Sequence, residues 1–242
     1  MDKKRKVDII YRVIVVGLLA IMAFSAWQIG KILWEYHKGT AAYEDIKKIA
    51  GGAGAAAVQI DFDALRKKNP DIRAWLHSED TNIDYPVVQT TNNEKYLVQM
   101  FDLQWNGCGC LFIDCRCEKP FEDFKTVIYG HRMKDGSMFG NFGKYRKQNY
   151  LDNHKEFIIQ TESQKYKAEL FAVITIHASN KLFEMQPKTE SEKEEFLGEI
   201  QKQNTITTNL DVTPRDNILM LSTCTYEFEN ARLVLCGKLT RL

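Results

Sequence analysis

The sequence lacks an excess of charge of either sign, because 33 Lys and Arg residues balance 32 Asp and Glu residues over 242 positions, a formal net charge of +1. Proteins that coat nucleic acid normally carry a marked basic excess, so this balance argues against that class. The sequence also lacks internal repeats, and its aromatic content of 11% argues against intrinsic disorder. A hydrophobic content of 44% is sufficient for the core of one large domain or of two small ones.

The cysteines lack the even spacing of a disulfide-stapled scaffold, although there are six of them. Four fall within ten residues in a C-x-C-x4-C-x-C pattern, and the other two are Cys224 and Cys236. The pattern is compatible with four thiolates around zinc, although C-x-C is less common in such sites than C-x2-C. Disulfides within the cluster are a second alternative, and we expect free thiols. The clustered residues are Cys108, Cys110, Cys115 and Cys117.

Basic residues are concentrated at the N-terminus, where residues 1–12 contain five basic and two acidic side chains. Residues 13–30 then carry no charge, and as a helix at about 1.5 Å per residue they span roughly 27 Å, close to the ~30 Å hydrocarbon core of a membrane. We therefore predict a cytoplasmic basic tail (1–12) and a single transmembrane anchor (13–34), with the rest of the chain outside the cell. A cleaved signal peptide, with Ala23 and Ser25 as a weak cleavage site, is the alternative.

Small residues separate this anchor from the remainder of the chain. Residues 35–57 are predicted to form a stalk or linker, in which 35–50 are compatible with a helix and the glycine- and alanine-rich stretch 51–57 with a flexible break. The folded domain is expected to begin near Val58 and to occupy residues 58–242.

Apolar runs rich in β-forming residues predict several short strands within that domain. Residues 189–203 place Phe196, Leu197 and Ile200 at helical spacing in a background of Glu and Lys, which predicts an amphipathic surface helix. Six or more strands with few helices favour a mainly β fold, in the form of a closed or nearly closed β-barrel. The strand-like segments are 82–89, 111–114, 125–130, a hairpin over 157–176, 217–226 and 231–239.

Two of these strands end at residues suited to nucleophilic catalysis. His131 follows the strand 125–130, and Cys224 stands near the end of 217–226. A cysteine thiolate is a strong nucleophile, and a nearby imidazole can take or give a proton. The alternative is a surface histidine and a buried thiol without a catalytic role.

Arg232 adds a third group, because it lies eight residues after Cys224 at the start of the next strand. In a hairpin the two residues would lie near one end, opposite or diagonal, where a guanidinium could stabilise an oxyanion. A surface ion pair is the alternative for Arg232. The same register places Cys236 about 13 Å along the strand from the level of Cys224, so a buried structural thiol is expected rather than a disulfide.

Three segments carry a resemblance to a known family: NIDYPVVQ at 82–89, TVIYGHRMKDGSMFGNFGKY at 126–145 and LSTCTYEFENARLVL at 221–235. They resemble the sortases, and specifically the class B sortases, over about residues 60–242. Where the family has a TLxTC-type nucleophile motif, this sequence has LSTC. The resemblance implies a closed barrel of about eight strands, with N-terminal helices and a surface helix between two late strands.

The same resemblance implies a cysteine transpeptidase outside the membrane. Cys224 would attack the carbonyl after Thr in a C-terminal sorting signal, and His131 would protonate the departing amine. A peptidoglycan amine, from a precursor or a cross-bridge, would resolve the thioacyl enzyme with His131 as its base. Arg232 would hold the oxyanion, with the backbone N–H of Thr225 as a second donor.

Further residues are matched to a substrate groove by the resemblance. Asn93, Leu97 and Ser222 stand at matching motif positions, whereas Leu182 and Phe183 are candidates only. No metal or organic cofactor is implied. The expected partners are surface proteins that bear a sorting signal, the acceptor amine and the membrane, without nucleic acid.

Two alternative functions stay open. The first is a surface cysteine hydrolase of the same fold, in which water resolves the intermediate. The second is a membrane-anchored metal- or thiol-binding module that uses the Cys108–Cys117 cluster and is indifferent to the loss of Cys224 or His131.

Overall fold

The computed structural model describes residues 3–52 and 59–242, which form two compact units. One unit reaches to Thr40, and the other runs from Ala41 to Leu242. Most of the predicted small-residue break, together with the predicted start of the domain at Val58, lies outside the described residues.

The first unit is helical. Its described residues belong to α1 (Lys3–Ile49), in which the stretch from Ile10 onward is long and apolar enough to cross a membrane. The side chains of its most apolar part are not buried, and Leu18 and Phe24 are each 59% exposed. Such a surface is suited to lipid rather than to a protein core. The predicted anchor at 13–34 lies entirely within this helix.

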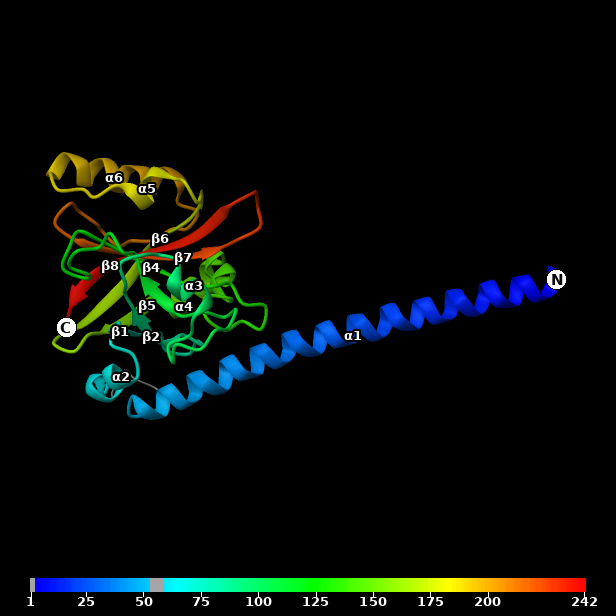
Figure 1. Cartoon of the computed structure of the whole chain (residues 1–242). Coiled ribbons are helices and arrows are strands. Elements are labelled where there is room, and N and C mark those ends of the chain that lie inside the picture. The colour runs from blue at the N-terminus through cyan, green and yellow to red at the C-terminus, as the bar shows by residue number, and fades with distance from the viewer. Residues whose placement is uncertain (1–2, 53–58) are drawn as a thin grey trace. The chain divides into compact units, whose positions relative to one another are not determined.

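The second unit is built around a closed β-barrel, as the mainly β sequence pattern predicts (Figure 1). The described residues form eight strands in the order β1-β2-β3-β4-β7-β8-β6-β5, with β5 pairing back onto β1. The β2–β3 and β4–β7 pairs are parallel, and the other pairs are antiparallel. The strands are β1 (Ile72–His77), β2 (Asp84–Val88), β3 (Leu111–Ile113), β4 (Lys125–Tyr129), β5 (Glu156–Gln160), β6 (Lys165–His177), β7 (Asn217–Cys224) and β8 (Ala231–Arg241).

Strand β1 closes the barrel, although the sequence pattern does not predict a strand there. Arg73 is exposed, whereas Ala74, Trp75 and Leu76 are all buried in succession. This run lacks the strict alternation of a half-buried strand, so periodicity does not identify it.

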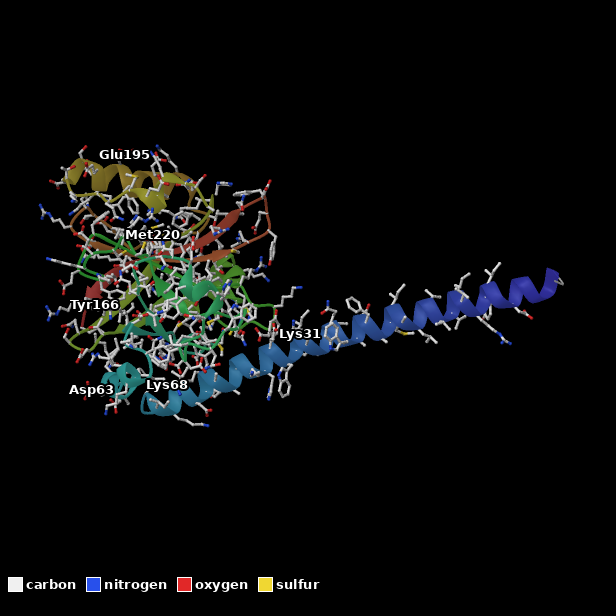
Figure 2. All side chains as sticks on the ribbon, viewed as in Figure 1. Lys31, Asp63, Lys68, Tyr166, Glu195 and Met220 are labelled. Atoms are coloured by element: carbon white, nitrogen blue, oxygen red, sulfur yellow. The ribbon has the colours of Figure 1, made fainter. Side chains whose placement is uncertain are left out.

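The amphipathic helix between two late strands is present as α6 (Glu190–Gln203), which confirms its prediction. A capping box begins it, because the Thr189 hydroxyl accepts from the backbone N–H of Glu192 while the Glu192 carboxylate accepts from the backbone N–H of Thr189. Its inner face packs Phe196 into a core cluster that includes Met220 of β7. Figure 2 shows Met220 in the barrel beneath α6 and Glu195 on the outer side of that helix. Other described helices are α2 (Phe62–Lys68), α3 (Lys95–Val98), α4 (Gln148–His154), α5 (Lys181–Glu184) and the 3-10 helix η1 (Phe142–Arg146).

The second unit begins earlier than the predicted domain. Tyr43 and Ile46, near the end of α1, are buried, and the Tyr43 ring packs edge-on against Tyr85 of β2 at a centroid distance of 5.4 Å. Their spacing of three residues places both on one face of the helix. The prediction of a stalk over 35–57 therefore has to be corrected: the described residues from Ala41 onward belong to the folded unit.

Candidate active site

The ends of β4 and β7 bring His131 and Cys224 together. The two strands are parallel, with Tyr129 opposite Ser222, and the N–H of Gly130 donates to the carbonyl of Ser222 at 3.1 Å. His131 and Cys224 each lie two residues beyond the Tyr129–Ser222 pair. Because neighbouring strands lie about 4.8 Å apart, the histidine and the cysteine are neighbours across this edge of the barrel.

Arg232 lies directly opposite Cys224 on the β7–β8 hairpin. Its Nη1 donates to the carbonyl of Ala231 at 3.1 Å, and the ion pairs found among the described residues do not include it. The guanidinium therefore keeps further N–H donors for an incoming oxygen. Cys236 lies opposite Met220, four positions along the strand, and is fully buried as predicted. Burial raises the pKa of the Cys236 thiol well above its usual value.

A pocket of about 260 Å³, here called the Cys224 pocket, is lined by Cys224, His131 and Arg232 together. Asn93, Leu97 and Ser222 line the same pocket, and so does Phe183. Leu182 is fully buried and does not line it. The lining residues that sequence reasoning did not select are Phe112, Tyr129, Gly130, Ala178 and Thr223.

A backbone carbonyl fixes the orientation of His131. Its Nε2 atom lies 2.7 Å from the carbonyl oxygen of Leu97. Because a carbonyl oxygen only accepts hydrogen bonds, Nε2 carries the proton in this contact. Because this hydrogen bond occupies Nε2, Nδ1 is the ring atom left for proton exchange.

Gly109 packs against the same histidine from the loop before β3. Its φ of +57° lies in the left-handed region, and a Cβ there would stand 2.4 Å from the carbonyl oxygen of Tyr96 and 3.1 Å from Cδ2 of His131. The Gly109 carbonyl accepts a hydrogen bond from the Tyr43 hydroxyl at 2.6 Å. The end of α1 therefore supports the loop on which the imidazole rests.

Gly109→Ala is expected to lower the free energy of unfolding by about 2 kcal/mol, because the new methyl group combines left-handed strain with a backbone clash. Urea denaturation followed by circular dichroism measures this change. Gly107→Ala is the matched control, because a Cβ at Gly107 meets no atom within 4 Å. Equal stability of the two variants would contradict the packing described for Gly109.

Thr225 follows Cys224 but is committed to other partners. Its backbone N–H donates to the carbonyl of Ala231 at 3.1 Å, and its hydroxyl donates to the carboxylate of Glu227. The expected role of this N–H as a second oxyanion donor is therefore corrected, because the N–H belongs to the β7–β8 connection.

Aromatic rings form one wall of the Cys224 pocket. Tyr129 packs between Phe112, at a centroid distance of 5.3 Å, and Phe183, at 6.0 Å. Its hydroxyl donates to Asp114 at 2.8 Å. Burial opposes the charge on Asp114, but hydrogen bonds from Arg116 and Tyr129 outweigh it and lower the pKa of the carboxyl to about 2. The charged carboxylate thus holds the tyrosine ring in place.

Polar groups in the same pocket are available to an occupant. Ser222 is 1% exposed, and its Oγ has no hydrogen-bond partner among the described residues. A buried hydroxyl left unpaired costs about 1–3 kcal/mol, so a ligand that hydrogen-bonds to it gains that amount. The side-chain oxygen of Asn93 accepts from the backbone N–H of Cys115 at 2.8 Å, which leaves its NH₂ group as a donor.

The cysteine cluster is divided by β3. The thiol of Cys110, before β3, donates to the carbonyl of Pro86, whereas the thiol of Cys117, after β3, donates to the carbonyl of Lys125. All six cysteines are free thiols, as expected. Within residues 3–52 and 59–242, no group of three or more metal-ligating side chains comes together. The described geometry therefore does not bring the four cysteines of the cluster together in the manner of a zinc site.

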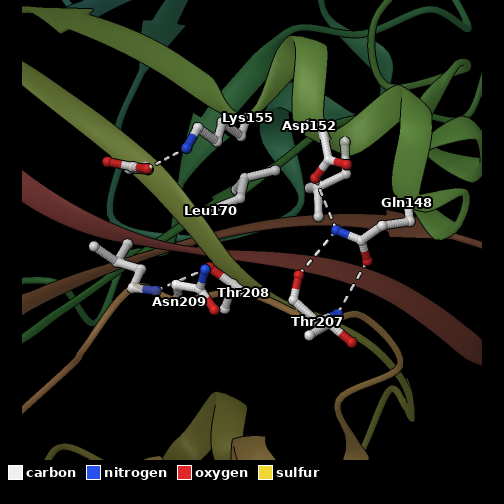
Figure 3. A pocket seen from close by; sticks show the side chains of 10 residues that line it. Gln148, Asp152, Lys155, Leu170, Thr207, Thr208 and Asn209 are labelled. Carbon is white, nitrogen blue, oxygen red and sulfur yellow. Dashed lines mark hydrogen bonds and ion pairs between the residues drawn. The ribbon is translucent and has the colours of Figure 1, made fainter.

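A second pocket, of about 480 Å³, lies between α4 and the loop before β7 (Figure 3). Several of its polar groups are paired with one another: Gln148 donates to Asp152 and to the carbonyl of Thr207, and Lys155 pairs with Glu169 at 2.8 Å. The described residues that line it include no cysteine or histidine. Its described lining therefore offers no thiol–imidazole pair of the kind that lines the Cys224 pocket.

Comparison with known proteins agrees with this geometry. The sequence model of the sortase domain matches residues 76–240 of the chain. Sortase B of Listeria monocytogenes is 33% identical over 229 residues, which cover 92% of this chain and 93% of that protein.

Solved structures with the same barrel are also similar to this chain. Sortase B from B. anthracis in complex with AAEK1 has a TM-score of 0.78 and 30% identity, covering 87% of this chain and 100% of that one. A Staphylococcus aureus sortase B–substrate complex has a TM-score of 0.78 and 27% identity, covering 86% of this chain and 99% of that one.

Proposed function

Because the chain belongs to the sortase family, as a class B sortase and hence a cysteine transpeptidase, we propose that it cleaves a C-terminal sorting signal after Thr and joins the new end to a peptidoglycan amine. The observation that carries this proposal is the convergence of Cys224, His131 and Arg232 on one pocket. The pairing of a thiol with an imidazole and a guanidinium suits acyl transfer through a thioester.

The first step forms the acyl enzyme. His131 takes the thiol proton, and the Cys224 thiolate attacks the carbonyl carbon of Thr, so a sulfur–carbon bond forms and the carbonyl oxygen becomes an oxyanion. The Arg232 guanidinium stabilises that oxyanion by hydrogen bonding. The carbon–nitrogen bond then breaks, and His131 gives its proton to the departing amine.

The second step transfers the acyl group. An amine of a peptidoglycan precursor or cross-bridge attacks the thioester, and His131 accepts a proton from that amine. The sulfur–carbon bond breaks, which restores the Cys224 thiolate and leaves a new amide. A thioester suits this exchange because it stays reactive toward amines.

The Cys224 pocket is proposed to hold the sorting signal. The unpaired Ser222 hydroxyl and the Asn93 NH₂ group offer hydrogen bonds to a peptide, and Leu97 with the aromatic wall offers apolar contact. The similar S. aureus barrel, solved as a substrate complex, supports a peptide site in this fold.

Membrane anchoring completes the proposal. The apolar part of α1 is proposed to span the membrane with the basic residues 1–12 inside and the barrel outside. A membrane-impermeant maleimide should label Cys224 on intact cells. Labelling that requires cell lysis would contradict this orientation.

The proposed function is tested by incubating the detergent-solubilised full chain with a small library of sorting-signal peptides and hydroxylamine as a model amine. We expect cleavage after Thr and release of the hydroxamate, identified by mass. A product that is always the free acid, despite the amine, indicates the alternative cysteine hydrolase. No cleavage of any peptide would contradict the proposal.

Arg232→Met is expected to lower kcat/KM for peptide cleavage by about 100- to 1,000-fold, the effect of removing one oxyanion donor. Arg232→Lys should recover only part of this loss, because an ammonium lacks the planar fork of the guanidinium. Steady-state kinetics of the two variants measure the effect. Arg241→Met, at the opposite end of β8, is the control, and an Arg232→Met enzyme as active as this control would contradict the role.

A further inference from the structure

Lys125, the first residue of β4, is a charged side chain that the proposed chemistry does not use. It is 2% exposed, and its ammonium donates to the carbonyl oxygens of Leu182 at 3.0 Å, Phe183 at 2.9 Å and Met185 at 2.5 Å. The ion pairs found among the described residues do not include it. A lysine is almost never buried to this extent unless its charge is compensated, so the three carbonyls are its compensation.

The three carbonyls come from a single turn of chain. They belong to α5 and to the residue that ends it, Met185, where main-chain carbonyls have no intrahelical partner and carry the negative end of the helix dipole. A helix of four residues is too short to be stable alone. Lys125 therefore attaches the C-terminal end of α5 to the barrel. Asn180 caps the N-terminal end of the helix, where its side chain accepts from the N–H of Leu182 at 3.0 Å.

The turn bound by Lys125 contains Phe183, which forms part of the wall of the Cys224 pocket. Phe183 is nearly buried, lines the pocket and packs against Tyr129. Tyr129 and Lys125 are the two ends of β4, so one strand holds both the aromatic ring and the turn that packs on it.

A direct part in catalysis is excluded by distance. Lys125 lies opposite Ile218, six residues before Cys224 on β7, which corresponds to about 20 Å along the strand. Burial lowers the pKa of Lys125 to about 8, so the ammonium remains the main form at neutral pH. Lys125 is thus placed to bind carbonyls and is too far away to exchange protons with the substrate.

We propose that Lys125 is a positioning residue for substrate recognition, which holds the turn 181–185 so that Phe183 presents its ring to an apolar side chain of the peptide. The inference rests on the proposed function, because it concerns the same pocket and the same peptide.

The first test is Lys125→Met, which keeps the length of the side chain and removes its charge and donors. In the full chain, KM for the cleaved peptide should rise about tenfold while kcat changes by less than about twofold, because charge-assisted hydrogen bonds are lost far from the reacting atoms. The control is Lys238→Met, since Lys238 also donates to a loop carbonyl, that of Asp211 at 3.0 Å, but does not line the pocket.

A double-mutant cycle tests whether Lys125 affects KM through Phe183. If Lys125 acts through Phe183, the KM of the double variant Lys125→Met/Phe183→Ala should be close to that of Phe183→Ala alone. If the two residues act independently, the fold increases in KM of the two single variants should multiply in the double variant. Asn180→Ala removes the N-terminal cap of α5 and so loosens the same turn. It should also raise KM for the peptide. If Lys125→Met does not fold, this variant tests whether the position of the turn determines KM.

An unchanged KM in a folded Lys125→Met enzyme, or multiplied effects in the cycle, would overturn this inference while leaving the proposed function intact. Alkylation of Cys224 by iodoacetamide, which does not depend on the peptide, should proceed at the wild-type rate in Lys125→Met. A large change in that rate would show that the substitution disturbs the nucleophile, and it would overturn the positioning role.

Discussion

Cys224→Ala is expected to abolish peptide cleavage, with a loss in kcat of at least about 1,000-fold, while the barrel stays folded. The loss is large because the sulfur forms the covalent bond to the substrate. The fold should persist because Cys224 is only partly buried, at the end of β7, and its substitution leaves no large cavity. Peptide cleavage followed by mass spectrometry, together with circular dichroism, measures both effects.

Cys115→Ala is the matched control for that experiment. Cys115 is also a partly buried free thiol, but it does not line the Cys224 pocket. The control should retain wild-type cleavage. Full activity of Cys224→Ala, or inactivity of Cys115→Ala with its fold intact, would contradict the assignment of the nucleophile.

His131→Gln is expected to lower kcat by about 100- to 10,000-fold, the usual contribution of a general acid–base group. Glutamine can still donate to the carbonyl of Leu97, so it preserves the contact that orients the side chain while removing proton transfer. Steady-state kinetics of peptide cleavage measure this loss.

His177→Gln provides the comparison, because His177 is exposed and bonds to the hydroxyl of Ser179. That variant should show the wild-type rate. A His131→Gln enzyme as active as His177→Gln would mean that another group transfers the proton.

The proposed catalytic residues His131 and Cys224 were predictable because each follows an apolar run. The runs before His131 and Cys224 become β4 and β7, and the eight-residue interval to Arg232 suits a hairpin that places it opposite the cysteine. The hydrophobic periodicity does not predict which strands become neighbours, because it is a local pattern and β4 and β7 are separated by almost ninety residues. The family motifs supplied that pairing.

Features that depend on tertiary packing were not predictable in the same way. Lys125 stands at the edge of an apolar strand, and only the position of α5 explains its burial. Gly109 and Tyr43 are far apart in sequence, so their support of His131 arises from the fold. The apolar residues of α1 after Ala41 did carry a helical spacing, but the small-residue break at 51–57 favoured a linker.

The covalent intermediate is the central claim, and mass mapping of the acyl enzyme tests it most directly. The full chain is incubated with a cleavable sorting-signal peptide, quenched in acid, digested and analysed for the cysteine that carries the N-terminal peptide fragment. We predict a thioester on Cys224 alone, which disappears when hydroxylamine is added as the hydroxamate forms. Cleavage that leaves Cys224 unmodified throughout, or a thioester on any of the other five cysteines, would contradict the account.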